Sequence, residues 1–326
     1  MKKILLTLAC VFGMSTVASA LTSSAVLLQH NGNITTYAAE DIAKAMAAAA
    51  DGDEVFLNEG KYPGFTISKS IKIKGVGQET VISGDIIIER SDDKIFDDLF
   101  IGYVYMEDIL QAKSEIKKIM LSQCQIISSP GSSFKAVAEE VIVDRCDIYL
   151  NLSSNYQAEI TVDGETKTYK TLCVKKFTAM NSIITIFQGT SLSSYPLYSF
   201  INCYVGLKGH SYGLNVMNSI FGYTGTSTIA DSEFTNTTFY NGIMNSCKLT
   251  GCYDVNGSAS SVNSDSTEEF LKENGYLGDD GTVVGPLGGA RNTPFTLVPT
   301  VPRVTESSLK VDPQKKELNV TVTVTP

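Results

Sequence analysis

The segment Met120-Leu121-Ser122-Gln123-Cys124-Gln125-Ile126 carries a pattern that recurs along the middle of the chain. Apolar residues are followed by a polar residue, then by Ser or Cys, and then by a return to apolar or aromatic residues. Variants of the pattern occur at 142–148, 180–184, 201–205, 217–221, 229–234 and 244–247. The intervals from Cys124 to Cys146 and from Ser182 to Cys203 are nearly equal. Both match the length of one coil of three short strands, and repeats with a period of about 20 residues indicate a solenoid.

Some intervals between these segments depart from that period. The much longer interval from Cys146 to Ser182 contains Asp163-Gly164, a dipeptide typical of hairpin turns, and therefore predicts an excursion from the stack. The later intervals, which end at Ser219, Ser232 and Ser246, are shorter than such a coil. They indicate either tighter coils or successive strands within one coil.

Stacking explains the choice of residues in the repeated pattern. Successive coils lie about 4.8 Å apart, so equivalent positions form columns along the axis. An Asn at a tight corner can hydrogen-bond the neighbouring coil, and the Ser or Cys beside it is small enough to face inward. We therefore predict that Cys124, Cys146 and Cys203 are buried and reduced. Cys247 and Cys252 are expected either to fill the core in the same way or to form a disulfide, which export permits.

The N-terminal segment 1–20 has the features of a secretory signal peptide. A basic start, Lys2-Lys3, precedes an apolar run over 4–17, and Ala18-Ser19-Ala20 supplies the small residues of a cleavage site. Attachment of a lipid at Cys10 is the alternative. The apolar run is too short to cross a bilayer, and no later stretch reaches about 18 apolar residues, so no membrane span is expected. The protein is expected to be exported to the periplasm, the cell surface or the extracellular space.

One long helix is predicted, at about 38–50. Its apolar residues share one face at helical spacing: Ile42, Ala45, Met46 and Ala49. Such a helix can cover the open end of a solenoid. Short Val- and Ile-rich strands punctuated by Gly follow it, and beyond residue 265 the pattern changes. The chain is therefore divided into a signal peptide (1–20), a parallel β-helix (21–265) and a turn-rich and β C-terminal tail (266–326).

Two further segments carry a resemblance to a known family. Ala47-Ala48-Ala49-Ala50-Asp51-Gly52-Asp53-Glu54-Val55-Phe56-Leu57-Asn58-Glu59-Gly60-Lys61-Tyr62 and Ser70-Ile71-Lys72-Ile73-Lys74-Gly75-Val76-Gly77 resemble the entry to pectate-lyase-like helices. The later Asn-Cys and Asn-Ser strands are similar to secreted Bacteroidetes β-helix proteins of unknown function. The resemblance implies an all-β fold: a right-handed single-stranded parallel β-helix with an N-terminal capping helix and a short β-rich C-terminal tail. It does not imply an activity.

The charge balance disfavours some partners. The chain carries 26 basic and 35 acidic side chains, a net charge of −9, and loss of Lys2 and Lys3 with the signal peptide makes it −11. Phosphate binding relies on Lys and Arg. Neither nucleic acid nor an anionic lipid is therefore an expected partner.

Candidate catalytic groups are few. The loop 89–98 combines carboxylates with Arg and Lys, and it is the one candidate for calcium, the cation that a lyase of this fold would use. Such a loop is more often a solvated connection, so no metal and no cofactor are assigned. Lys208-Gly209-His210-Ser211 lacks the partner carboxylates of a glycoside hydrolase, and the Arg-x-Pro-x-x-Arg pattern of pectate lyases is missing. No catalytic residue is assigned.

Four tyrosines each follow one of the repeated segments: Tyr204, Tyr223, Tyr240 and Tyr253. If the segments stack, these tyrosines can form a ladder on one outer face, where aromatic rings can pack on sugars. A purely structural ladder is the alternative. The sequence thus predicts a non-catalytic exported protein that binds an extracellular polysaccharide or a cell-envelope component. The alternative is a divergent polysaccharide lyase or glycoside hydrolase. If the protein is an enzyme, a polysaccharide lyase is expected.

Overall fold

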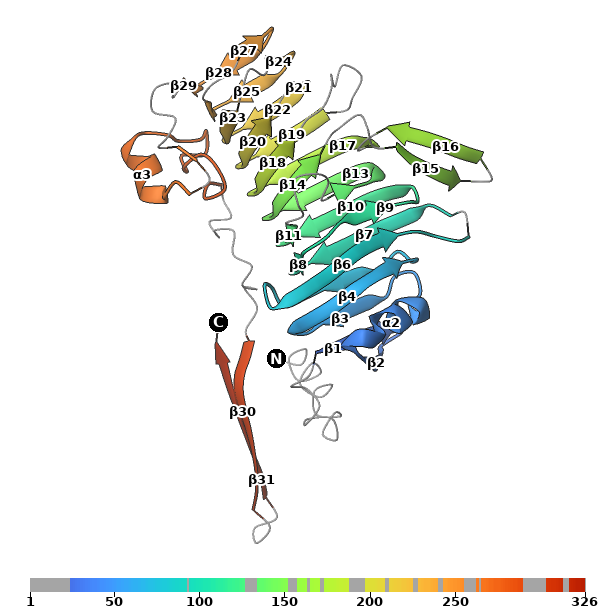
Figure 1. Ribbon diagram of the computed structural model, residues 1–326. Helices are drawn as coiled ribbons and strands as arrows, with labels where there is room; N and C mark the ends of the chain where they lie inside the picture. Colours follow the sequence, from blue (N-terminus) through green and yellow to red (C-terminus); the bar gives the residue numbers. More distant parts are fainter. Residues whose placement is uncertain are drawn as a thin grey trace.

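The structure is a computed structural model. It describes residues 24–92, 94–126, 134–151, 157–162, 165–170, 173–187, 197–208, 211–224, 228–239, 243–254, 262–263, 265–289, 303–312 and 317–325. Short strands stack along one axis, from the N-terminal coil to the coil that contains β27, β28 and β29 (Figure 1). From β3 onward each strand of the stack pairs in parallel with the equivalent strand of the next coil. The predicted all-β parallel β-helix is confirmed.

Two long sheets and a short one form the walls of the solenoid. The first sheet, called sheet A here, has the order β2 (Asn33–Ala38), β1 (Ala25–His30), β3 (Glu54–Leu57), β5 (Lys72–Lys74), β7 (Phe96–Gly102), β10 (Ile116–Ser122), β13 (Val137–Asp144), β17 (Cys173–Met180), β19 (Leu197–Ile201), β22 (Leu214–Met217), β25 (Glu233–Thr235) and β28 (Lys248–Thr250). Sheet B has the order β12 (Phe134–Lys135), β9 (Leu110–Ala112), β6 (Thr80–Ile88), β8 (Tyr105–Met106), β11 (Gln125–Ile126), β14 (Asp147–Asn151), β18 (Ile183–Phe187), β20 (Tyr204–Lys208), β23 (Ile220–Thr224), β26 (Thr238–Phe239) and β29 (Tyr253–Asp254), with β4 (Gly60–Ile67) beside β6. The short sheet joins β21 (Ser211–Tyr212), β24 (Thr228–Ala230) and β27 (Ile243–Asn245).

The corner between sheets A and B is built on residues with a positive φ. Its non-glycine members have φ between 44° and 58°: Tyr103, Gln123, Arg145, Asn181, Asn202, Asn218 and Asn236. Each donates its backbone N–H to the next coil, as Asn202 does to the carbonyl of Met217 at 3.0 Å. Asn adopts the left-handed conformation more readily than most residues. The polar position of the repeated segments is therefore the corner residue.

The residue after each corner residue is small and faces the core. Its members hydrogen-bond along the column, as when the backbone N–H of Cys146 donates to Ser182 Oγ at 3.0 Å. Cys124, Cys146 and Cys203 are completely buried thiols, which confirms the prediction for them. Cys247 and Cys252 are partly exposed, and neither forms a disulfide.

A second corner and tighter coils together explain the shorter intervals. Gly213, Asp231 and Ser246 also have positive φ, and they precede strands of sheet A rather than of sheet B. The segments 229–234 and 244–247 therefore belong to this second corner, in the same coils as Asn236 and Gly251 of the first. The interval that ends at Ser232 therefore joins successive strands within one coil, whereas the intervals that end at Ser219 and Ser246 join equivalent positions of adjacent, tighter coils, so both interpretations are confirmed, each for some of these intervals.

The predicted N-terminal helix is present. It begins as a single 3-10 turn, η1 (Ala39–Asp41), and continues as α2 (Ile42–Ala48). Its buried residues Ile42, Ala45 and Met46 belong to the main core. The helix therefore covers the core at the N-terminal end of the stack.

Two hairpins leave the stack. Within the long interval, β15 (Gln157–Val162) and β16 (Glu165–Lys170) pair antiparallel, which confirms the predicted excursion, while Asp163-Gly164 lies outside the described residues. Near the C-terminus, β30 (Arg303–Asp312) and β31 (Glu317–Thr325) form a separate antiparallel hairpin. Within the described residues, no helix has the length and apolar character needed to cross a membrane.

The helix α3 (Glu268–Glu273) and the following segment 276–289, called the strap here, pack on the outside of the solenoid. The amide of Asn181 donates to the carbonyl of Gly288 at 2.8 Å, and that of Asn218 to Asp279 Oδ1 at 2.7 Å. A Cβ on Gly289 would lie 2.3 Å from Asn202 Nδ2. The strap thus follows the Asn column closely, and glycine is required where it approaches that column.

Candidate functional site

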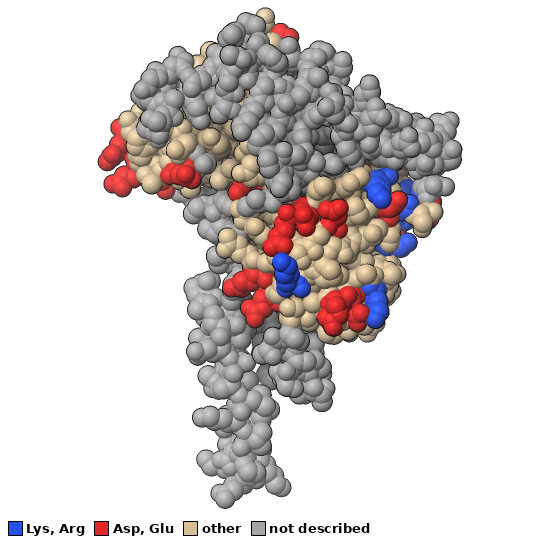
Figure 2. Space-filling model, viewed as in Figure 1, with Lys and Arg blue, Asp and Glu red and all other residues tan. Residues whose placement is uncertain are grey.

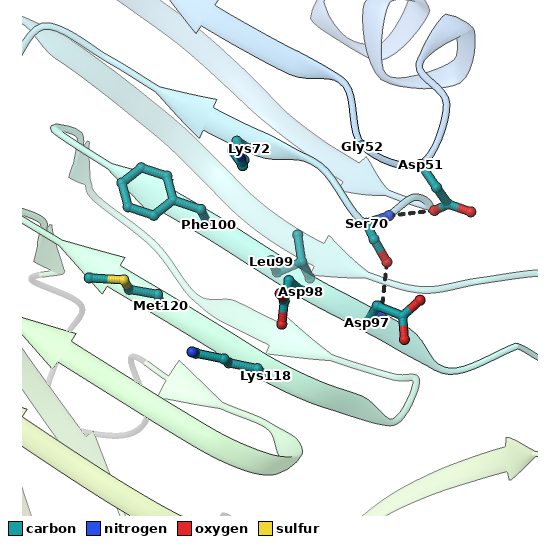
Figure 3. Close-up of a pocket in the computed structure, with 10 residues that line it drawn as sticks. All are labelled: Asp51, Gly52, Ser70, Lys72, Asp97, Asp98, Leu99, Phe100, Lys118 and Met120. Atoms are coloured by element: carbon teal, nitrogen blue, oxygen red, sulfur yellow. Dashed lines mark hydrogen bonds between the residues drawn. The ribbon is translucent and has the colours of Figure 1, made fainter.

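A groove lies on the outer face of sheet A near its N-terminal end. It has a volume of about 480 Å³ and is formed by β5, β7, β10 and the turn after α2 (Figure 3). Its lining residues combine apolar, acidic and basic side chains: Asp51, Gly52, Ser70, Lys72, Asp97, Asp98, Leu99, Phe100, Lys118 and Met120. The groove is open, so it suits a ligand that lies along the sheet.

An aromatic ring lies at the centre of this face. Phe100 of β7 pairs with Lys72 of β5 on one side and with Met120 of β10 on the other. A Cβ on Gly102 would lie 2.7 Å from Cε1 and Cζ of Phe100, so the ring occupies the space above Gly102. Figure 3 shows the ring lying along the sheet, with Met120 on the neighbouring strand. Because Gly102 has no side chain, the ring of Phe100 can lie close to the sheet and present an aromatic surface to the groove.

Charged doublets run beside this aromatic surface. In four successive strands of sheet A, two charged residues stand between two buried residues, and the sign alternates from strand to strand. The doublets are Asp97-Asp98, Lys117-Lys118, Glu139-Glu140 and Lys175-Lys176. The sequence contained this signal, because each doublet is flanked by apolar residues at the same positions, but our reading of the sequence missed it.

Ion pairs neutralise much of this charge between coils. Lys117 contacts Asp97 at 2.5 Å, and Lys176 contacts Glu140 at 2.8 Å. Hydrogen bonding to Asp97 raises the pKa of Lys117, and hydrogen bonding to Lys175 lowers the pKa of Glu139. Exposed pairs of this kind contribute little stability individually. Their consequence is electrostatic, because the face presents no extended field of one sign.

The surface view agrees with this mixture. Acidic and basic side chains alternate over the N-terminal half of the solenoid in Figure 2, and acidic side chains gather over α3 and the strap at the left. The acidic residues of that second region include Glu268, Glu269, Asp279 and Asp280. The described part of the face seen in Figure 2 therefore lacks a basic patch that would bind a polyanion.

A polar cleft of about 320 Å³ adjoins the groove and shares Asp51 and Gly52 with it. In this cleft, Nδ1 of His30 lies 2.8 Å and 3.0 Å from the two carboxylate oxygens of Asp53. Asp53 is nearly buried and also accepts a hydrogen bond from the backbone N–H of Ala50 at 2.8 Å. A carboxylate at Nδ1 fixes the imidazole and leaves Nε2 as the acceptor, 2.9 Å from the amide of Asn31. Sequence reasoning missed this pair.

The loop proposed for calcium is organised around a guanidinium. Arg90, with a side chain only 3% exposed, makes two hydrogen bonds to Asp51 and two to Asp92. These bonds raise the pKa of Arg90 and lower the pKa values of both carboxyl groups. The carboxylate of Asp92 is thus engaged by Arg90, and Asp93 lies outside the described residues. Within the described part of the chain, no group of three His, Cys, Asp or Glu side chains could hold a metal ion.

The four predicted tyrosines do not form one ladder in the described coils. Tyr204 in β20 and Tyr253 in β29 occupy the same column of sheet B. Tyr223 in β23 pairs instead with Leu207, three positions further along the strand. Tyr240 lies outside the described residues. The structure therefore brings two of the four positions into register.

Tyr204 and Tyr253 both contact the C-terminal segment. Tyr204 packs against the apolar cluster that joins Ile220 to α3 and the strap. Tyr253 donates its hydroxyl to the carbonyl of Leu277 at 3.3 Å, and its ring stands edge-on to Tyr276 with centroids 5.6 Å apart. These contacts give both tyrosines a packing role. Contact of the four tyrosines with a glycan stays a prediction.

No protein-family model matches the chain, and no curated protein matches it. What the structure establishes is the class of the protein: a parallel β-solenoid with a mixed-charge groove on one of its two long sheets.

Proposed function

We propose that this protein is exported and binds an extended glycan of low charge along the outer face of sheet A, without altering it chemically. The observation that carries the proposal is the ring of Phe100 lying over Gly102 within the groove. Sugar rings present C–H faces that pack on aromatic surfaces. An open groove on a regular sheet also suits a polymer whose repeating units lie side by side.

The groups around Phe100 suit the polar edges of such a sugar. Lys72 and Lys118 can donate hydrogen bonds to hydroxyl groups, and Asp98 can accept them. Lys72 already lies 3.3 Å from Glu54, and Lys118 lies 3.9 Å from Glu140, so neither is an uncompensated charge. This balance, together with the acidic composition of the whole chain, favours a neutral or weakly charged polymer over a polyanion.

Export and family membership are part of the same proposal. Export is supported by the basic start, the apolar run and Ala18-Ser19-Ala20 in the segment 1–20. Kinship with pectate-lyase-like β-helices is supported by the order of capping helix, Asp-Gly turn and short parallel strands. The proposed partner is an extracellular polysaccharide or a cell-envelope component, met in the periplasm, at the surface or outside the cell.

The test is a binding panel with matched aromatic variants. The protein is titrated with neutral glucans, mannans and xylans and, for contrast, with polygalacturonate. Phe100→Ala should weaken binding to the preferred neutral polymer by about five- to tenfold, since a stacking contact contributes about 1 kcal/mol and about 1.4 kcal/mol is a factor of ten. The control is Phe56→Ala, which removes a half-buried aromatic residue of β3 outside the groove. Preference for polygalacturonate, or equal effects of the two variants, would contradict the proposal.

The alternative function is a divergent polysaccharide lyase or glycoside hydrolase. The observation in its favour is the His30–Asp53 pair in the cleft beside the groove, because an imidazole held at Nδ1 by a carboxylate can accept a proton at Nε2. A single base fits proton abstraction by a lyase better than hydrolysis, which needs two carboxyl groups. The same panel is assayed for unsaturated and reducing ends. If products form with the unmodified protein and not with His30→Ala, the protein is an enzyme, and the proposal of binding without chemical change is wrong.

A further inference from the structure

Two columns of residues run side by side along the solenoid axis on the outer face of sheet A. The strands β7, β10, β13 and β17 pair without a register shift, so equivalent residues of successive coils stand in line. The rim column holds Asp98, Lys118, Glu140 and Lys176. The central column holds Phe100, Met120, Ile142 and Thr178. Figure 3 shows the first two members of each column, and the register continues both columns beyond the groove, across β13 and β17.

The central column is an apolar strip over three successive coils. Phe100, Met120 and Ile142 are each half-buried, so part of every side chain faces the solvent. On the side away from the rim, Gly102 and Ser122 stand in register with each other and are too small to rise above the strip. The surface is therefore apolar in the middle, charged along one side and low on the other. This shape suits the flat face of a sugar ring with one edge turned to the rim.

The spacing of the coils matches an extended polysaccharide that lies along the axis. Neighbouring strands lie about 4.8 Å apart, which is close to the length that one sugar unit adds to an extended chain. A polymer that follows the central column therefore places one sugar on each coil. A polymer that follows a single strand would contact only one member of each column, so the axial direction uses the repeated surface more fully.

The rim column alternates between groups that only accept hydrogen bonds and groups that only donate them. The carboxylates of Asp98 and Glu140 accept, whereas the ammonium groups of Lys118 and Lys176 donate. The pattern therefore repeats every two coils. In an extended ribbon polymer each sugar is rotated by half a turn relative to the one before it, so its two edges face a given side alternately. One edge carries a pair of ring hydroxyl groups, which can donate, and the other carries the ring oxygen, which can only accept.

We propose, on the basis of the binding function proposed above, that the site selects an unbranched polymer with this two-sugar repeat, such as a β-1,4-linked glucan or mannan. Its ring hydroxyl pairs meet the carboxylates of the rim, and its ring oxygens meet the ammonium groups, while the central column packs on the sugar faces. Four sugars then cover the four rim residues. A helical polymer turns its edges away from this line and leaves rim groups without partners.

The ion pairs of the rim leave its charged groups available for this contact. Lys176 lies 2.8 Å from Glu140, and Lys118 lies 3.9 Å from the same carboxylate. Both lysine side chains are at least 41% exposed. Because pairs of this kind contribute little stability individually, the rim can exchange part of its internal contact for hydrogen bonds to a sugar.

The first experiment tests the linkage and the length of the ligand. Isothermal titration calorimetry measures the affinity of the full chain for linear β-1,4-linked gluco- and manno-oligosaccharides of increasing length, and for α-1,4-linked gluco-oligosaccharides of the same lengths. Affinity for the preferred β-linked series should rise up to the tetrasaccharide and then level off, because four coils carry the rim. The α-linked series should bind about tenfold or more weakly, because rim hydrogen bonds are lost. Equal affinity for the two linkages, or no gain beyond the disaccharide, would overturn the proposal.

The same titrations distinguish failure of this proposal from failure of the binding function. If Phe100→Ala weakens binding but the two linkages bind alike, glycan binding stands and the two-sugar repeat is wrong. If neither these oligosaccharides nor the polymers of the binding panel bind, both proposals are wrong.

The second experiment tests the rim with a matched pair of double variants. Lys118→Gln combined with Glu140→Gln removes one donating and one accepting charge from the rim. Lys117→Gln combined with Glu139→Gln removes the same charges from the neighbouring doublet positions, one residue further from the central column. The rim variant should weaken binding of the β-linked tetrasaccharide by about tenfold, and the control by less than about twofold. Equal effects in folded variants would show that the alternation serves ion pairing between coils alone, and would overturn the proposal.

Discussion

The ring of Phe100 occupies the space above Gly102, two positions further along β7, and a Cβ at Gly102 would lie 2.7 Å from two of its carbon atoms. Gly102→Ala should therefore displace the ring without unfolding the protein. The atoms that the new Cβ would meet lie at the end of the Phe100 side chain, which can rotate away, whereas backbone atoms could not. We expect glycan affinity to fall about three- to tenfold, which corresponds to about 1 kcal/mol. The measurement is a double-variant cycle: Gly102→Ala should have little further effect in a Phe100→Ala background. Additive losses would show that Gly102 acts independently of the ring.

Arg90 is expected to stabilise the turn after the capping helix. Its buried side chain bonds to Asp51 and Asp92 and lies 5.3 Å from the centroid of Phe96. Arg90→Met keeps much of the packing but leaves both carboxylates without this donor. We expect the free energy of unfolding to fall by about 2 kcal/mol, measured by urea denaturation. Lys113→Met, which removes an exposed cation 3.5 Å from Glu89, is the control and should change stability little. An equal loss of stability from the two substitutions would show that Arg90 stabilises the fold no more than an exposed cation does.

The same cluster predicts a dependence of stability on pH. The guanidinium of Arg90 lowers the pKa values of Asp51 and Asp92 in the folded protein. Their contribution is therefore fully present above the ordinary pKa of aspartate, about 3.9, and is lost as the pH falls below that value. Unfolding measured between neutral pH and about pH 3 should show a smaller loss of stability for Arg90→Met than for the unmodified protein. Parallel curves would contradict the assignment.

The cysteines should fall into two classes of reactivity. Burial raises the pKa of Cys203 to about 12 and raises the pKa of Cys146 as well. Because the thiolate is the reactive form, Cys146 and Cys203 should resist a polar thiol reagent until denaturant is added. Cys124 should resist it as well, because its side chain is completely buried and the reagent cannot reach it. Cys247 and Cys252, which are partly exposed, should react before these three, and mass spectrometry of digested protein measures the order. Early labelling of the buried three would show that the coils open readily.

The tyrosine hypothesis has its own test. Tyr204→Ala combined with Tyr223→Ala should weaken binding of the preferred glycan by roughly tenfold or more if the two rings contact it, at about 1 kcal/mol for each contact. Both residues lie in sheet B, away from the Phe100 groove. Unchanged affinity in a folded double variant would assign Tyr204 to its packing against α3 and the strap alone.

The repeated segment predicted the coil well because it encodes local geometry. An Asn favours a left-handed corner, and the Ser, Cys or Thr after it is small enough to turn inward, wherever the segment stands in the chain. The capping helix was predictable for the same reason, since its apolar face follows from helical spacing alone. The charged doublets were also visible in the sequence, but their meaning depends on which doublets become neighbours.

The sequence by itself determined that the chain coils, that polar residues such as Asn mark tight corners, and which small residues face the core, because each of these depends on a few adjacent residues. Tertiary structure alone decided which side chains meet between coils, because coil lengths vary and each length shifts the register of the next strand. It paired Phe100 with Met120 and Lys72, and it joined His30 to Asp53 and Arg90 to Asp51 from distant parts of the sequence. It also placed Tyr223 in a different column from Tyr204. The repeated segments alone could not show this, because both tyrosines follow such a segment.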